Sequence, residues 1–130
     1  MEDLLRKTGY SDKAIEYYLK KLHVGNIKDP SVVFSYTGPC GDTFKIYLSI
    51  DAGIIKEATF EAIGCAGAFS AASALIEMIT GKNINQVNNI KEEDIIDHLG
   101  GVPVTKMDCV HLAKVTFKKT LQQYRSKGKD

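Results

Sequence analysis

Two neighbouring stretches of alternating residues, 43–50 and 54–63, constrain the fold of this chain more than any other feature. From 43 to 50 and from 57 to 62 every second side chain is apolar, so an extended strand would carry one apolar and one polar face there. The short segment 51–53 between them favours a tight turn and an antiparallel hairpin. The apolar face of this hairpin must be covered. Its side chains are Phe44, Ile46, Leu48 and Ile50, then Ala58, Phe60 and Ala62.

Helices are expected to provide the cover. Residues 66–80 and 106–124 carry apolar side chains at helical spacing, and the first of these stretches stops at Gly81. Residues 32–36 add a short β-type segment. Strands followed by helices predict the α+β class: a small antiparallel three-stranded sheet with helices packed on one face and a long C-terminal helix. Shorter helices are expected after a Ser11 cap (with Ile15, Tyr18, Leu19 and Leu22 as its apolar stripe), after an Asn83–Gln86 capping box, and at 92–99.

The 130 residues contain no internal repeat and are expected to form one domain, 1–130, with a flexible tail from about residue 125. A formal net charge of +1 provides no general field for nucleic acid or anionic lipid. The acidic start and the lack of a long apolar run predict neither a secretion signal nor a membrane span, so a cytoplasmic protein is expected. The basic residues gathered after position 113 are either a solvated helix face or a docking patch for an acidic partner.

The three cysteines, Cys40, Cys65 and Cys109, are odd in number and are separated by 24 and 43 residues, which argues against a disulfide framework. Each lies at a junction: before the first long strand, at the turn from strand to helix, and in the first turn of the last helix. Backbone N–H groups at a helix N-terminus stabilise a thiolate, the form that binds metal. Glycines beside Cys40 and Cys65 let the backbone approach a bulky ligand.

Asp42 follows Cys40 by two positions, so on an extended segment both side chains project to the same side. The carboxylate either shares a ligand with the thiolate or caps a turn. Three thiolates and one oxygen suit a tetrahedral zinc site or an iron–sulfur cluster that sulfur ligates incompletely. Asp108 and Lys106 lie close to Cys109 in the sequence and are candidates for a further ligand or a site neighbour.

Other catalytic chemistry is not expected. His111 lies two positions from Cys109 on a helix, where side chains point to different sides, and is interpreted as a surface or core residue. Ser70 and Ser73 lack a base with an orienting partner, so no hydrolase triad is predicted and no catalytic residue is assigned.

Three segments together carry a resemblance to a known family: Gly38-Pro39-Cys40-Gly41-Asp42-Thr43, then Ile63-Gly64-Cys65-Ala66-Gly67-Ala68, then the stretch 99–109 that ends at Cys109. In order and spacing they resemble the IscU/NifU-type iron–sulfur cluster assembly scaffolds, over residues 17–124. The resemblance implies a non-enzymatic scaffold on which a transient [2Fe–2S] cluster is built with sulfur from a cysteine desulfurase and then passed to apo acceptor proteins. It also implies that the cysteines bind the cluster and accept sulfur, and that Asp42 promotes cluster release.

The chain departs from the family pattern at three places. Asp108 stands where many relatives have His, so Asp42, Asp108 or an external group is left as fourth ligand. The segment Val102-Pro103-Val104-Thr105-Lys106 replaces Leu-Pro-Pro-Val-Lys, so the resemblance does not carry over recognition by an Hsp70-type chaperone. The segment 20–25 differs from Asn-Pro-Arg-Asn-Val-Gly, so a partner that recognises that segment is not carried over either.

Two alternatives use the same residues. One is a zinc-dependent sulfurtransferase that resembles the SufU branch and accepts persulfide sulfur from the desulfurase. The other is a small fold stabilised by structural zinc, although such sites usually have four Cys or His ligands. The sequence leaves the chain as a monomer or a weak homo-oligomer.

Overall fold

The computed structural model describes residues 2–39 and 41–128. Its three strands form one antiparallel sheet with β2 in the centre. The strands are β1 (Val32–Thr37), β2 (Thr43–Asp51) and β3 (Ile54–Ile63). The helices are α1 (Glu2–Lys7), α2 (Asp12–Lys20), α3 (Ala66–Ile79), α4 (Ile84–Val87), α5 (Glu92–Leu99) and α6 (Met107–Gly128), with a 3-10 turn, η1 (Val104–Lys106), leading into α6.

The predicted hairpin is confirmed. Ile46 pairs with Phe60 and Leu48 with Ala58, so apolar side chains share one face of β2 and β3. Ala52 and Gly53 in the turn have φ angles of 53° and 79°. Two successive residues with positive φ match the right-handed twist of the flanking strands and allow the tight reversal.

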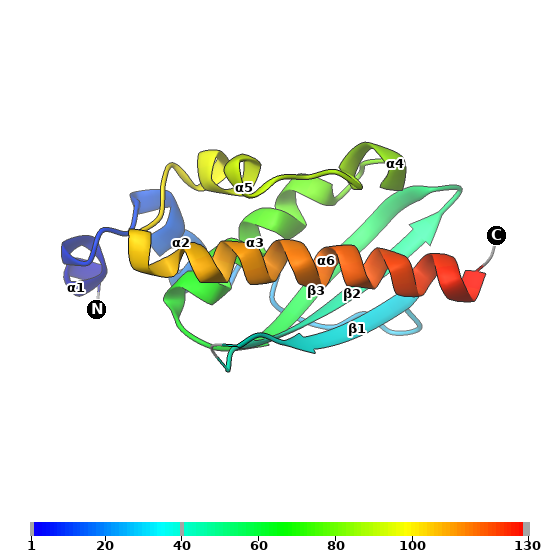
Figure 1. Cartoon of the computed structure of the whole chain (residues 1–130), viewed down its shortest axis with the longest axis horizontal. Helices are drawn as coiled ribbons and strands as arrows, with labels where there is room; N and C mark the ends of the chain where they lie inside the picture. The colour runs from blue at the N-terminus through cyan, green and yellow to red at the C-terminus, as the bar shows by residue number, and fades with distance from the viewer. Residues whose placement is uncertain (1, 40, 129–130) are drawn as a thin grey trace.

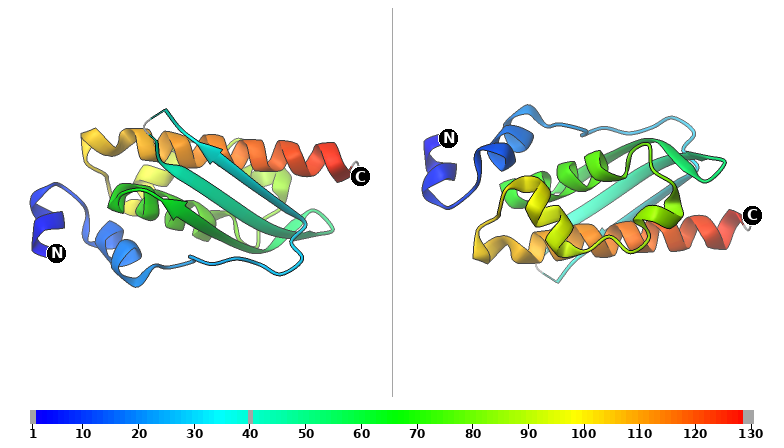
Figure 2. Two further views of the ribbon diagram at one scale, coloured as in Figure 1. Left: turned by 90° about the horizontal axis from the view of Figure 1, so that it is seen from below. Right: turned by 90° about the horizontal axis from the view of Figure 1, so that it is seen from above.

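Helices α3 and α6 cover this apolar face and α5 packs on these two helices, as Figures 1 and 2 show; in the part of the chain that the structure describes the other face carries no helix. The predicted α+β class is therefore confirmed, including the long C-terminal helix. No helix among the described residues has the length and apolar character that a membrane span requires.

Helix α3 is the central element of the core. It packs against the sheet, α2, α5 and α6, and most of its side chains are buried. The hydroxyl of Ser70 donates to the carbonyl oxygen of Ala14 at 2.9 Å, and that of Ser73 donates to Leu22 at 2.8 Å. The two buried serines therefore fasten α2 and the turn after it to α3, which accounts for them without a catalytic role.

The first predicted helix needs correction. Ser11 does cap it, since its side chain accepts a hydrogen bond from the Ala14 N–H group. However, Lys21 takes the left-handed conformation and ends the helix, so Leu22 lies beyond it. Leu19, predicted on the apolar stripe, is 45% exposed. The helix instead buries Ala14, Ile15 and Tyr17 against its neighbours.

Candidate metal centre

Three chain segments meet at one end of the molecule: the turn from β1 to β2, the start of α3 and the start of α6 (Figure 1). They bring together Asp42, Cys65 and Cys109, whose ligand atoms all lie within 4.8 Å of one another. The two sulfur atoms are 3.7 Å apart, and the Cys109 sulfur is 3.9 Å from Oδ2 of Asp42. Cys40, the fourth predicted ligand, lies outside the described residues.

The turn before β2 is held on α6 by a close approach. The N–H group of Gly38 donates to the carbonyl oxygen of Asp42 at 2.9 Å, and that of Gly41 donates to Gly38 at 3.0 Å. A Cβ atom on Gly38 would lie only 2.8 Å from Cδ1 of Leu112. Glycine at position 38 therefore lets the turn rest on α6, which positions Asp42 beside the start of that helix.

Gly64 likewise leaves space for a close contact, in this case with the Asp42 carboxylate. A Cβ atom at position 64 would lie 2.9 Å from Cγ of Asp42 and 3.0 Å from its Oδ2. The carboxylate thus occupies the space that any other residue at position 64 would need. This contact holds Asp42 next to Cys65, the following residue.

Cys65 is the N-cap residue of α3, with an extended backbone, and its side chain makes no capping hydrogen bond. Burial by itself raises the pKa of this thiol, but other interactions outweigh that effect. The backbone N–H groups of Ala68 and Gly67, in the first turn of α3, stabilise the negative charge of the thiolate. A hydrogen bond with Cys109 and the charge of Lys106 act in the same direction, so the pKa of Cys65 lies below its usual value.

Cys109 is the third residue of α6 and is only 4% exposed. Burial, the nearby Cys65 thiolate and the charge of Asp42 raise the pKa of Cys109 to about 12. Lys106 opposes this shift without cancelling it. The pair therefore consists of one thiol that ionises readily and one that keeps its proton until a positive charge arrives.

These distances fit a shared metal ion. Two thiolates on one tetrahedral ion with metal–sulfur bonds near 2.3 Å are separated by about 3.8 Å, and a thiolate and a carboxylate oxygen by about 3.6 Å. The observed separations are 3.7 Å between the sulfurs and 3.9 Å from sulfur to oxygen. Both cysteines are free, so their sulfur atoms are available as ligands. The described part of the site can therefore take up a thiophilic metal with little movement.

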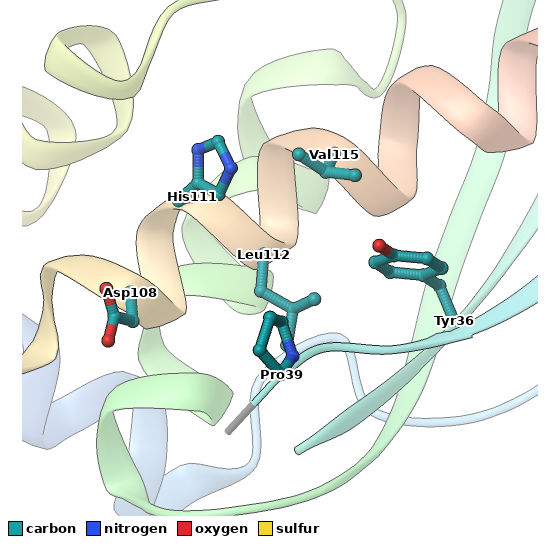
Figure 3. A pocket seen from close by; sticks show the side chains of 6 residues that line it. All are labelled: Tyr36, Pro39, Asp108, His111, Leu112 and Val115. Atoms are coloured by element: carbon teal, nitrogen blue, oxygen red, sulfur yellow. The ribbon is translucent and has the colours of Figure 1, made fainter. Parts of the chain in front are cut away.

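The two further candidates, Lys106 and Asp108, have different surroundings in the structure. Lys106 is half-buried beside Gly67, and its charge acts on both thiols. Asp108 is exposed and does not join the group that Asp42 forms with the cysteines. It lines a neighbouring cavity of about 350 Å³ instead, where Figure 3 shows it on α6. The other lining residues are Tyr36, Pro39, His111, Leu112 and Val115.

The histidines take no part in the site. His111 is exposed on α6 and its Nδ1 lies 2.6 Å from the Glu92 carboxylate. His98 and His23 both contact Glu77, at 2.7 Å and 3.4 Å. Of the two interpretations of His111, as a surface or as a core residue, the structure supports the surface one.

One neighbour of the site was missed at the sequence level. Tyr10 lines the same cavity as Cys65 and Lys106, and its hydroxyl lies against Gly67. No spacing pattern could link a tyrosine to a cysteine 55 positions away, because only the packing of α2 on α3 brings them together.

Comparisons with known proteins identify a family, related sequences and a similar fold. The family described as "NifU-like N terminal domain" matches residues 9–130. The iron-sulfur cluster assembly scaffold protein IscU 1 of Archaeoglobus fulgidus is 34% identical over 122 residues, covering 92% of this chain and 80% of that protein. The scaffold protein IscU of Escherichia coli K12 is 33% identical over 123 residues, covering 91% and 95%. The crystal structure of a nitrogen-fixing NifU-like protein (N-terminal) from Brucella abortus superposes with a TM-score of 0.74 at 16% identity, over 95% of this chain and 99% of that one.

Proposed function

We propose that this chain, which belongs to the family of NifU-like N-terminal domains, is a scaffold that assembles a transient [2Fe–2S] cluster and passes it to acceptor proteins. The observation that carries the proposal is the convergence of Asp42, Cys65 and Cys109 from three separate segments. Relatives that match over most of their length are named scaffolds for such clusters. The ligands that we propose are these three residues and Cys40.

The two thiols suit successive steps of assembly. The Cys65 thiolate, favoured by the first turn of α3, is the group that first binds an incoming ferrous ion. That positive charge then favours loss of the proton from Cys109, which is released to solvent as the second sulfur binds. Sulfur is the other substrate: a cysteine desulfurase removes it from cysteine as a persulfide, and an external two-electron donor, such as a dithiol, reduces it to sulfide.

Asp42 explains why such a cluster would be transient. A carboxylate oxygen is a hard ligand beside soft thiolates, and it holds iron less firmly than a fourth thiolate would. In the structure this oxygen lies 3.9 Å from the Cys109 sulfur, and Asp42 is only partly buried. Release to an apo acceptor protein therefore begins most easily at Asp42.

The zinc-dependent sulfurtransferase remains the second candidate, because the 3.7 Å separation of the sulfurs also fits tetrahedral zinc. In that case the chain would keep its zinc and receive persulfide sulfur on a cysteine. We favour the scaffold, a carrier without turnover of its own, because the matched relatives carry that name. The partners we propose are a cysteine desulfurase and apo iron–sulfur proteins in the cytoplasm, and no nucleic acid.

The test is anaerobic reconstitution with ferrous iron, cysteine, a cysteine desulfurase and a dithiol reductant, followed by visible absorbance. The parent chain is expected to develop a cluster spectrum that Cys40→Ala, Cys65→Ala and Cys109→Ala each abolish. Asp108→Ala is the matched control, since this exposed carboxylate lies outside the group, and it should behave like the parent. A colourless parent that retains stoichiometric zinc and accelerates the desulfurase would overturn the scaffold in favour of the sulfurtransferase. Zinc whose removal only unfolds the chain would indicate a structural site.

A further inference from the structure

Tyr10 is a buried tyrosine beside the cysteines that the proposed ligand set does not use. It is 8% exposed although it lies in the short connection between α1 and α2. A Cβ atom on Gly67 would lie 3.1 Å from its hydroxyl oxygen. Gly67 is the second residue of α3, so the hydroxyl lies over the same helical turn that begins at Cys65.

The backbone around Tyr10 is fixed on both sides. Its N–H group donates to the carbonyl oxygen of Leu5 at 3.2 Å, which closes the end of α1. The next residue, Ser11, caps α2 and donates from its hydroxyl to the carbonyl oxygen of Leu99 at 2.6 Å. These contacts direct the ring toward α3 and leave the hydroxyl little freedom to move away.

The surroundings of the hydroxyl favour donation to sulfur. Tyr10, Cys65 and Lys106 line one cavity of about 400 Å³. The tyrosine hydroxyl can donate one hydrogen bond, and Cys65 lines the same cavity. The hydroxyl oxygen lies against the first turn of α3, at Gly67. Of the two charged groups that line this cavity among the described residues, a Cys65 thiolate accepts hydrogen bonds and the Lys106 ammonium only donates them, so the O–H group is directed at the sulfur.

We propose that the Tyr10 hydroxyl donates a hydrogen bond to the Cys65 sulfur when that sulfur binds metal, and that this bond retains the cluster on the scaffold. The inference rests on the proposed function and adds a positioning residue to it. A donor withdraws negative charge from a ligating sulfur, which raises the reduction potential of an iron–sulfur cluster. Removing a residue that hydrogen-bonds to a metal ligand commonly lowers the metal affinity by roughly 10- to 100-fold.

The first experiment uses Co²⁺ alone, bound to the parent chain and to Tyr10→Phe, and needs no cluster. Removing the donor makes the thiolate easier to oxidise, so the sulfur-to-cobalt charge-transfer band should move to lower energy, and Co²⁺ affinity should fall roughly tenfold. Tyr124→Phe removes a hydroxyl from a half-buried ring on α6 and should leave band and affinity unchanged. An unshifted band in Tyr10→Phe at saturating Co²⁺ would overturn the inference.

A second variant tests the inference even if Tyr10→Phe does not fold. Gly67→Ala keeps the hydroxyl but places a Cβ atom 3.1 Å from it, and 3.2 Å from the side chain of Lys106, so it should displace Tyr10 and shift the band in the same direction. A Gly67→Ala band at the parent energy would contradict the inference.

The cluster-loaded protein then separates the two proposals. If the parent forms a cluster, Tyr10→Phe should lower its reduction potential and speed its transfer to apo-ferredoxin several-fold. Equal potentials in parent and variant would overturn the inference about Tyr10 and leave the scaffold intact. If the parent forms no cluster, the scaffold proposal fails, while the Co²⁺ band still decides whether Tyr10 bonds to the ligating sulfur.

Discussion

Gly64 and Asp42 approach each other so closely that a Cβ atom on Gly64 would lie 2.9 Å from the Asp42 carboxyl carbon. Gly64→Ala should therefore push the carboxylate away from Cys65 and Cys109. Because that carboxylate is the proposed point of release, we expect cluster transfer to apo-ferredoxin to slow several-fold, as in Asp42→Ala. The measurement is the rate at which the acceptor gains its cluster absorbance.

A variant that carries both Gly64→Ala and Asp42→Ala supplies the control for this prediction. If Gly64→Ala acts only by displacing the carboxylate, it should change nothing further in an Asp42→Ala background. An added slowing in the double variant would mean that Gly64→Ala disturbs the start of α3 itself.

A second close approach, between Gly38 and Leu112, predicts a stability effect. A Cβ atom on Gly38 would lie 2.8 Å from Cδ1 of Leu112, so Gly38→Ala should force the turn or the leucine to move and cost about 1–3 kcal/mol of unfolding free energy. Leu112→Ala should cost about 2–5 kcal/mol because this buried side chain leaves a cavity. Urea unfolding measures both.

The two changes should also compensate each other. In a Leu112→Ala background the space for a Cβ atom at position 38 is open, so the added cost of Gly38→Ala should fall close to zero. Full additivity of the two costs would show that the contact between these residues is not the cause.

The sequence predicted the parts of this fold in which local pattern and tertiary structure agree. The alternation of apolar and polar residues predicted the hairpin. The apolar stripe that includes Val110, Ala113 and Phe117 predicted the buried face of α6. Both patterns show which side of an element meets the core. It did not predict α1, because six residues with several charges form a helix only where packing of Leu5 supports it. It also placed Leu19 in the core, because nothing in the sequence shows that Lys21 ends the helix in a left-handed conformation.

The sequence indicated which residues come together at this site but not what surrounds them. Cysteines at the junctions of strands and helices stand out in the sequence, and the structure brings Cys65 and Cys109 together with Asp42. By contrast, the opposite pKa shifts of the two thiols depend on burial and on backbone N–H groups that only the packed structure defines. Asp108 was drawn into the ligand candidates by sequence adjacency, although on a helix the next residue points to a different side.

Lys106 should control the reactivity of Cys65. Its positive charge favours the thiolate, so Lys106→Met should raise the pKa of Cys65 and lower the rate of alkylation by iodoacetamide at pH 7 roughly two- to fivefold. The rate should rise with pH along a curve displaced to higher pH than that of the parent. Lys114→Met is the matched control, since Lys114 pairs with Glu92 at 3.0 Å instead of acting on the thiols. Identical pH profiles for Lys106→Met and the parent would contradict this role.

The last prediction concerns stability in acid and the cluster around Glu77. Burial disfavours its charged form, but hydrogen bonds from Tyr17, His98 and His23 outweigh burial and lower the pKa of Glu77 to about 2. A carboxyl group whose pKa is lower in the folded state stabilises the fold above the unfolded value of about 4.5. That contribution is lost as the pH falls from about 4.5 to about 2.

Glu77→Gln should therefore remove the part of the unfolding free energy that varies between pH 5 and pH 2, and leave the rest of the unfolding free energy unchanged. Because the Glu77 side chain is 40% exposed, solvent screening limits the effect to about 1 kcal/mol or less. Urea midpoints of the parent and the variant, measured at pH 7, 4 and 2.5, should converge as the pH falls. Glu93→Gln, an exposed change on α5, should show a constant small difference at all three values. A gap between parent and Glu77→Gln that is as wide at pH 2.5 as at pH 7 would mean that the side chain acts through packing and not through its charge.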